Sequence, residues 1–175
     1  MIIVFTGNGK GKTTASLGQM VRVTGRGKKA LMIQFIKGPW KSGEDEFSSQ
    51  YGNLAESFQV KKMGRGFVGI LGDNLPREEH ERAAEDGLEY FKKELASGRW
   101  DLIVLDEINV AVSLDLLKVE DVLGAIKAVP DDRFVILSGR GAPKEFIEVA
   151  DLATEMKEIK HPFNDGKMGK IAVEF

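Results

Sequence analysis

Short apolar runs alternate with longer amphipathic stretches along the chain. The apolar runs, which are typical of buried parallel strands, cover residues 2–6, 30–35, 102–105 and 134–137. Weaker strand patterns cover residues 54–60, 154–159 and 171–175. Helical patterns, with apolar side chains on one face, cover residues 12–23, 76–95, 119–126 and 143–149. This alternation predicts a single α/β domain over residues 1–175, with a mostly parallel sheet flanked by helices on both faces.

Two polar stretches that contain glycine, residues 36–50 and 64–74, are predicted to be long loops. Loops of this length in a compact domain are usually functional. Trp40 lies in the first loop and Phe67 in the second, and an apolar side chain in such a loop often covers a site. In this fold class the ligand site lies beyond the carboxyl ends of the strands.

Composition narrows the class of partner. Hydrophobic residues make up 42% of the chain and charged residues 30%, with a formal net charge of -2 and no basic run. Nucleic acid is therefore not an expected partner. The absence of cysteine excludes a disulfide framework, a thiolate zinc site and cysteine catalysis. No apolar run approaches the roughly 18 residues that span a bilayer, so we expect a cytoplasmic protein that does not enter a membrane.

A glycine-rich loop separates the first predicted strand from the first predicted helix. Its residues are Gly7, Asn8, Gly9, Lys10, Gly11, Lys12, Thr13 and Thr14. The usual phosphate-binding pattern is a glycine, four further residues and then Gly-Lys-Ser/Thr. Gly11-Lys12-Thr13 supplies the end of that pattern, while Thr6 stands where its first glycine is expected.

The chemistry of this loop suits a triphosphate. Glycines let backbone N–H groups turn inward as an anion-binding nest, and the helix that follows adds its positive end. Lys12 supplies a charge for the phosphates, and the hydroxyl of Thr13 can ligate Mg²⁺. The sequence therefore predicts binding of ATP with Mg²⁺, and the alternative is a simple glycine turn between strand and helix.

The apolar run 102–105 ends in two acids, Asp106 and Glu107. An acid at the end of a strand is the expected Mg²⁺ partner in phosphate-loop proteins. Glu107 could contact Mg²⁺ directly or through water, or act as a base for water in an ATPase. The alternative is that these acids only cap the next helix.

The remaining aromatic and histidine residues give weaker signals. His80 lies on a charged helix and is expected to be solvated. His161, in a late loop before Pro162, is a candidate site residue, although a hydrogen bond within its loop is an equal alternative. Trp100, just before a strand, is expected to pack in or beside the core.

Several motifs, in the same order along most of the chain, resemble one enzyme family. They comprise residues 6–14, 34–38, Trp40, 43–44, 105–107, 138–143, 150–152, 155–156 and 160–163. Together they resemble the phosphate-loop type of ATP:corrinoid adenosyltransferase, also called cob(I)alamin adenosyltransferase. No single glycine loop is specific, but this ordered set is.

The resemblance implies an activity. The family transfers the 5′-deoxyadenosyl group of ATP to cobalt(I) of a corrinoid, either cobalamin or a precursor, and releases triphosphate. It further implies a RecA-like fold, a homodimer and a flavoprotein reductant. By resemblance, residues 7–14 hold the triphosphate with Asn8 near the nucleoside, Thr13 and Glu107 bind Mg²⁺, and Lys12, Thr13 and Glu107 form the catalytic set. Cobalt(I) is itself a strong nucleophile, so the reaction needs positioning and charge stabilisation rather than a protein base.

The chain departs from the family pattern in the loop 64–74. The family's Gly-x-Gly-Phe-x-Trp stretch, whose aromatics lie beneath the corrin ring, keeps Phe67 but has Gly69 at the tryptophan position. Phe67, Trp40 and His161 are thus the candidate corrinoid-binding residues. The alternative functions are a phosphate-loop ATPase or kinase and a non-catalytic sensor of ATP or corrinoid.

Overall fold

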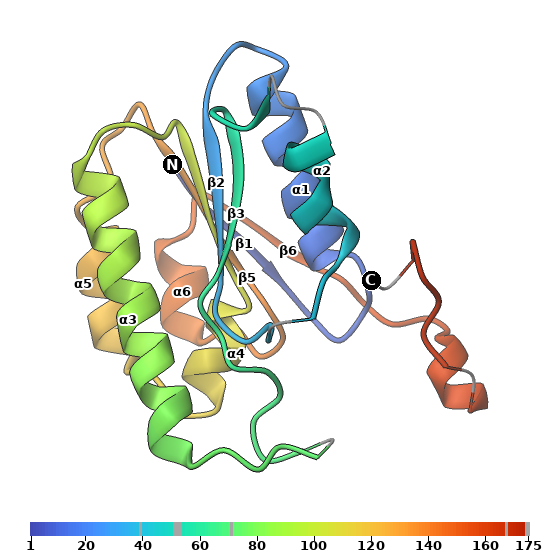
Figure 1. The fold of residues 1–175 in the computed structure, drawn as a ribbon. Helices are drawn as coiled ribbons and strands as arrows, with labels where there is room; N and C mark the ends of the chain where they lie inside the picture. Colours follow the sequence, from blue (N-terminus) through green and yellow to red (C-terminus); the bar gives the residue numbers. More distant parts are fainter. Residues whose placement is uncertain (39, 51–53, 71, 167, 174–175) are drawn as a thin grey trace.

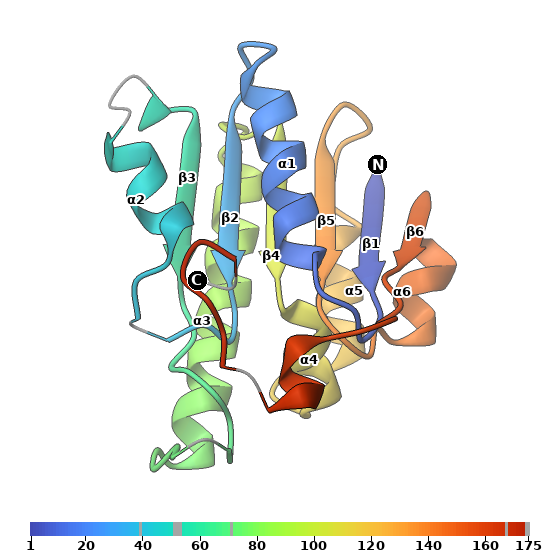
Figure 2. The same ribbon diagram turned by 90° about the vertical axis from the view of Figure 1, so that its right-hand side faces the viewer.

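The computed structural model describes residues 1–38, 40–50, 54–70, 72–166 and 168–173. Its six strands form one sheet in the order β3-β2-β4-β5-β1-β6, and every adjacent pair is parallel (Figure 2). The strands are β1 Ile2–Thr6, β2 Ala30–Gln34, β3 Phe58–Lys62, β4 Leu102–Asp106, β5 Phe134–Ser138 and β6 Leu152–Glu155. The predicted fold class, a mostly parallel sheet in an α/β fold, is confirmed.

Helices cover both faces of the sheet (Figure 1). One face carries α1 Lys12–Thr24 and α2 Gly43–Gln50. The other carries α3 Arg77–Ala96, α4 Ile108–Ser113, α5 Val119–Ile126 and α6 Lys144–Val149. A short 3-10 helix, η2 Pro162–Asp165, lies in the C-terminal segment. In the described residues, no helix has both the length and the apolar character needed to cross a membrane.

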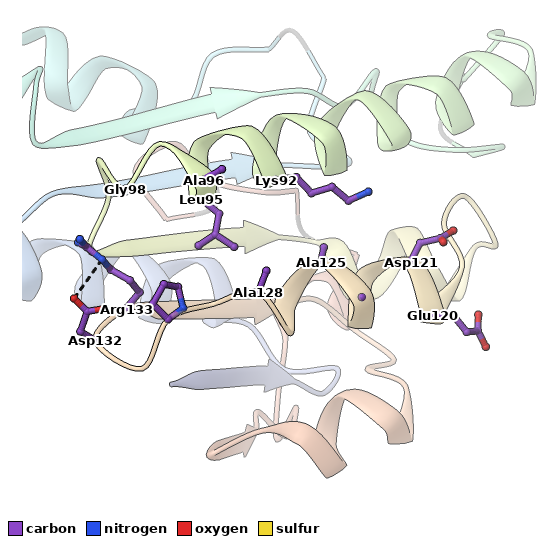
Figure 3. Close-up of a pocket in the computed structure, with 12 residues that line it drawn as sticks. Lys92, Leu95, Ala96, Gly98, Glu120, Asp121, Ala125, Ala128, Asp132 and Arg133 are labelled. Carbon is purple, nitrogen blue, oxygen red and sulfur yellow. Dashed lines mark ion pairs between the residues drawn. The ribbon is translucent and has the colours of Figure 1, made fainter.

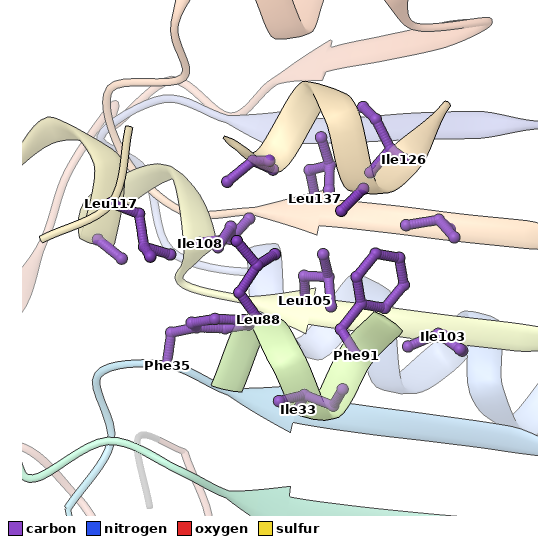
Figure 4. Close-up of a cluster of buried hydrophobic side chains, with 14 of the residues drawn as sticks. Ile33, Phe35, Leu88, Phe91, Ile103, Leu105, Ile108, Leu117, Ile126 and Leu137 are labelled. Atoms are coloured by element: carbon purple, nitrogen blue, oxygen red, sulfur yellow. The ribbon is translucent and has the colours of Figure 1, made fainter. Parts of the chain in front are cut away.

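The core has two layers because the central strands β2, β4 and β5 are buried on both faces. Alternate residues of β4 separate cleanly: Ile103 and Leu105 belong to the cluster under α3 to α6, and Leu102 and Val104 to the cluster under α1. Figure 4 shows the first cluster, in which Phe91 of α3 packs over the sheet. This burial on both sides explains why these strands are continuous apolar runs rather than alternating patterns.

The register of the sheet brings the carboxyl ends of the strands together. Phe5 of β1 pairs with Ser138 of β5, and Gln34 of β2 pairs with Asp106 of β4. Because β5 lies between β1 and β4, the glycine loop and the acid pair lie on either side of Ser138. The sheet therefore places the glycine loop, Ser138 and the acid pair at the same end of the strands.

Some predicted elements were wrong in their bounds. Residues 36–50, expected to be a loop, contain α2, whose first turn holds three acids that favour a helix N-terminus. The ring of Phe47 in α2 packs edge-on against Phe58 at 5.2 Å between centroids, which fixes this helix on the sheet. Strand β3 covers residues 58–62 instead of 54–60, and β6 covers 152–155 instead of 154–159. Residues 171–173 form a turn rather than the expected strand 171–175, and residues 174–175 lie outside the described part.

Candidate functional site

The glycine-rich loop joins the end of β1 to the start of α1. Gly7 and Gly11 have φ angles of 93° and 118°, a region that residues with side chains rarely adopt. Gly11 is the N-cap of α1, and no side chain caps the helix there. The positive end of α1 is therefore open to an anion such as a phosphate.

Lys12 is the buried cation of this loop, with 7% of its surface exposed. Its Nζ donates hydrogen bonds to the carbonyl oxygens of Gly7 and Gly9, each at 2.7 Å. Burial lowers the pKa of Lys12, and the nearby Glu107 carboxyl acts in the opposite direction. An ammonium has three N–H donors, so the lysine can hold the loop and still donate to a phosphate oxygen.

Asp106 is fully buried at the end of β4, and its carboxylate joins three elements. Oδ1 accepts hydrogen bonds from the hydroxyls of Thr13 at 3.0 Å and Ser138 at 2.7 Å. Oδ2 accepts one from the amide of Gln34 at 3.2 Å. The acid that contacts Thr13 is thus Asp106, and the assignment of Glu107 to Mg²⁺ stays a prediction.

Glu107 is the N-cap of α4, and it is the acid of the site whose pKa is shifted. Its φ of 62° is a strained value for a residue with a side chain, and such strain is common at functional sites. Its N–H donates to Oγ of Ser138 at 3.3 Å. Burial, followed by the charge of Asp106, raises the pKa of Glu107 to about 7, against the effect of Lys12 and two other cations.

These oxygens suit Mg²⁺ bound together with a nucleotide. Among the described residues, no group of three or more histidine or acidic side chains is arranged to hold a metal by itself. Mg²⁺, however, usually takes one or two carboxylates and completes its shell with water and phosphate oxygens. The Thr13 hydroxyl beside Asp106, with Glu107 next in sequence, is a donor set of that kind. Burial, and after it the charge of Asp106, raises the pKa of Glu107, and a bound cation would favour the ionised carboxylate against both.

Trp40 and Phe67 lie side by side although they come from different loops. Their ring centroids are 6.0 Å apart and the rings are tilted by 35°. Glycines make room for them, because a Cβ on Gly38 would lie 2.8 Å from the Trp40 ring. Trp40 is 62% exposed and Phe67 45% exposed, and both line a cavity of about 180 Å³. This surface follows the carboxyl ends of β2 and β3, the same edge of the sheet as the glycine loop.

A larger cavity, of about 780 Å³, lies between α3 and α5 (Figure 3). Leu95 and Ala125 face it from the two helices, and Arg133 lies at its end. None of the predicted site residues lines it. Its size alone therefore does not make it the active site.

Comparison with known proteins identifies the family. The model of the ATP:corrinoid adenosyltransferase family BtuR/CobO/CobP matches residues 1–175. The chain belongs to this family. It is similar to the corrinoid adenosyltransferases of Escherichia coli K12 (38% identity), Salmonella typhimurium LT2 (37%) and Pseudomonas aeruginosa PAO1 (36%). Each match spans 100% of this chain and 83% to 85% of the relative. The family resemblance inferred from the motifs is confirmed, and with it an enzyme for ATP-dependent adenosylation of corrinoids.

The structure of this adenosyltransferase corrects the prediction that the side chain of His80 is solvated. The residue was expected to be solvated, but it is 3% exposed, and its Nε2 lies 3.0 Å from Oδ2 of Asp73. Trp100 is 2% exposed in the core, as expected. Nδ1 of His161 accepts a hydrogen bond from the N–H of Phe163 at 3.2 Å, which is the local loop contact foreseen as its alternative.

Sequence reasoning placed Gln34 and Ser138 in the family motifs but missed their role in supporting the site, and it missed Asn109 altogether. Gln34 and Ser138 hold Asp106, and Asn109 donates to the carbonyl oxygens of Phe5 and Gly139. All three side chains are fully buried. For Gln34 and Ser138 the available signal was a polar residue at the end of an apolar strand, which is costly to bury unless it is hydrogen-bonded. Asn109 lies in α4 and gives no such signal.

Proposed function

We propose that this chain transfers the 5′-deoxyadenosyl group of ATP to cobalt(I) of a corrinoid at the glycine loop. The cobalt(I) electron pair forms a bond to C5′ of the ribose, and the bond from C5′ to its oxygen breaks. The triphosphate leaves with the electron pair of the broken C5′–O bond, and the cobalt becomes formally cobalt(III). The observation that carries the proposal is the buried Lys12 at an uncapped helix start, in a chain matched throughout by this family.

The loop residues then have defined roles. Gly7 to Thr14 hold the triphosphate through backbone N–H groups, and Asn8 lies near the nucleoside. Lys12 stabilises the charge that develops on the departing triphosphate, because a charge-assisted hydrogen bond in a buried site is strong. Its location is supported by its two bonds to loop carbonyls, which aim the ammonium into the loop.

Mg²⁺ would be held by the Thr13 hydroxyl and the acid pair of Asp106 and Glu107. When bound, it supplies positive charge to the phosphate oxygens. Thr13 is already oriented by its bond to Asp106 at 3.0 Å. Asp106 is in turn fixed by Ser138 and Gln34, so the donor set does not have to reorganise when the nucleotide binds.

The corrinoid is proposed to lie against Trp40 and Phe67. The support is an exposed aromatic pair at the same sheet edge as the glycine loop, because an open apolar surface marks a binding site. His161 is the least supported of the three candidates, since its described contact is with its own loop.

The cellular setting is also a proposal. We propose a cytoplasmic homodimer, supplied with electrons by a flavoprotein, in which residues 1–175 act as a single nucleotide-binding domain. The single sheet supports one domain, and the other features are supported only by the family.

An anaerobic assay with product identification tests the proposed function. The protein is mixed with ATP, Mg²⁺ and cobalamin that has been chemically reduced to cobalt(I). We expect a light-sensitive cobalt–carbon product and one triphosphate per product. Release of ADP and phosphate without corrinoid would instead indicate an ATPase, and tight ATP binding without turnover would indicate a sensor.

A further inference from the structure

Asp73, in the loop that carries Phe67, makes hydrogen bonds to two backbone N–H groups and to His80. Its Oδ2 accepts the N–H of Gly69 at 2.8 Å, and its Oδ1 accepts the N–H of Leu75 at 3.1 Å. Its Oδ2 also lies 3.0 Å from Nε2 of His80. The two backbone bonds lower the pKa of Asp73, so its carboxylate is an acceptor and His80 is the donor.

His80 is the only one of these partners that belongs to a regular element. It lies in the first turns of α3, and 2% of its side chain is exposed. A buried polar side chain is destabilising unless it is hydrogen-bonded. The described acceptor for the Nε2 proton is Asp73, which also accepts from Gly69 and Leu75. A buried group on a rigid helix therefore fixes the turn around Asp73.

The same turn determines where the aromatic pair is presented. Gly69 and Gly72 have φ angles of 68° and 82°. Because glycine is conformationally free, the shape of this turn depends on hydrogen bonds such as those to Asp73. Phe67 lies two residues before Gly69, with its ring 6.0 Å from that of Trp40. Asp73 lines the cavity of about 180 Å³ beside both rings. A turn released from α3 would move one wall of that cavity.

We propose that His80 is a positioning residue for the corrinoid substrate, because it holds through Asp73 the turn that presents Phe67 to Trp40. The proposal rests on the proposed function, in which the aromatic pair receives the corrinoid. His80 does not contact the substrate, and it lies apart from the hydrogen bonds around Lys12 and Asp106. It therefore controls corrinoid binding and leaves ATP binding unchanged.

The test compares three variants of the full-length protein in the anaerobic assay with chemically reduced cobalamin. His80→Leu removes the donor, His80→Gln keeps an N–H donor near the position of Nε2, and Asp73→Asn weakens the acceptor. We expect His80→Leu to raise the KM for cobalamin about tenfold and to change the KM for ATP by less than about twofold. His80→Gln should recover most of the affinity, and Asp73→Asn should resemble His80→Leu.

A second measurement reports on the loop itself. Arg65 is exposed two residues before Phe67, so trypsin cleavage after Arg65 should be faster in His80→Leu than in the wild type because the freed loop opens more often. Glu81→Gln is the matched control on the same helix, since it removes only the exposed pair with Arg77. This control should leave both KM values and the cleavage rate unchanged.

The outcomes separate the two proposals. Wild-type turnover with an unchanged cobalamin KM in a folded His80→Leu variant would overturn the positioning role alone, as would an equal rise in both KM values. If His80→Leu does not fold, Asp73→Asn decides, and a normal cobalamin KM in that variant would overturn the role. A wild-type protein that does not alkylate cobalamin would overturn the proposed function and this inference with it.

Discussion

The raised pKa of Glu107 predicts that the ligand-free protein becomes less stable as pH rises. The pKa of this carboxyl is about 7 in the folded protein against a reference value of 4.5. Because the folded-state pKa is raised, the protonated form favours folding. That stability is present in full below the unfolded pKa and is lost as the pH rises towards the folded pKa.

The size of the effect follows from the two pKa values. Between pH 5.0 and pH 8.5, a single group shifted from 4.5 to about 7 reduces the free energy of unfolding by about 2.5 kcal/mol. Glu107→Gln is neutral at every pH and keeps the shape of the protonated acid. The difference in unfolding free energy between wild type and this variant should therefore change by about 2.5 kcal/mol across that range.

Urea unfolding in the presence of EDTA measures this difference. Glu85→Gln, which changes an exposed acid on α3, is the control and should keep a constant offset from the wild type. Added Mg²⁺ and ATP should restore much of the lost stability at pH 8.5, because a cation compensates the acid pair. If the unfolding free energies of the wild type and Glu107→Gln change in parallel with pH, the pKa of Glu107 is not raised in the folded protein and the reasoning is refuted.

Four further substitutions test the glycine loop, helix α1 and the loop that carries Phe67. Lys12→Ala should slow adenosyl transfer by roughly 30- to 1,000-fold, which corresponds to roughly 2–4 kcal/mol in the transition state; near-normal single-turnover rates would refute its role. Gly7→Ala should disrupt the loop and abolish detectable ATP binding in calorimetry, since φ is 93° and the new Cβ would lie 2.4 Å from the Met156 carbonyl oxygen. Gly18→Ala in α1, where a Cβ meets nothing within 4 Å, should instead stabilise the fold by about 0.5–1 kcal/mol in thermal unfolding. Gly69→Trp has open space but a φ of 68°, so it should lower stability by about 1–2 kcal/mol and tighten corrinoid binding; an unchanged Kd would place this loop away from the corrin ring.

The strands and the phosphate loop could be predicted because their signals are local. A strand such as β4 is buried on both faces, so each of its positions is apolar and the run is visible in the sequence. Helix α2 could not be predicted in this way. Its eight residues contain one large apolar side chain, Phe47, and the contact of that ring with Phe58 exists only after the sheet forms.

Contacts of single side chains could not be predicted from local pattern alone. Asp106 is positioned by Thr13, Gln34 and Ser138, which are separated from it by 93, 72 and 32 residues. Which of the two adjacent acids would face Thr13 depends on how β4 ends and α4 begins, and no spacing rule expresses that. His80 was expected to be solvated because its helix is charged, and its actual acceptor lies seven residues earlier in an irregular loop.

The threonine that breaks the usual phosphate-loop spacing has a structural task in this fold. Oγ1 of Thr6 accepts the N–H of Ala142 at 3.1 Å, and its carbonyl oxygen accepts the N–H of Met156 at 2.8 Å. The carbonyl oxygen of Met156 in turn accepts the N–H of Gly9 at 2.7 Å. The loop is thus tied on one side to the turn after β5 and on the other to the end of β6. A glycine in place of Thr6 would lose the first of these ties. A loop fixed from two sides is preorganised for the charge of a leaving group, which suits the proposed reaction because the triphosphate departs whole from a loop that need not move.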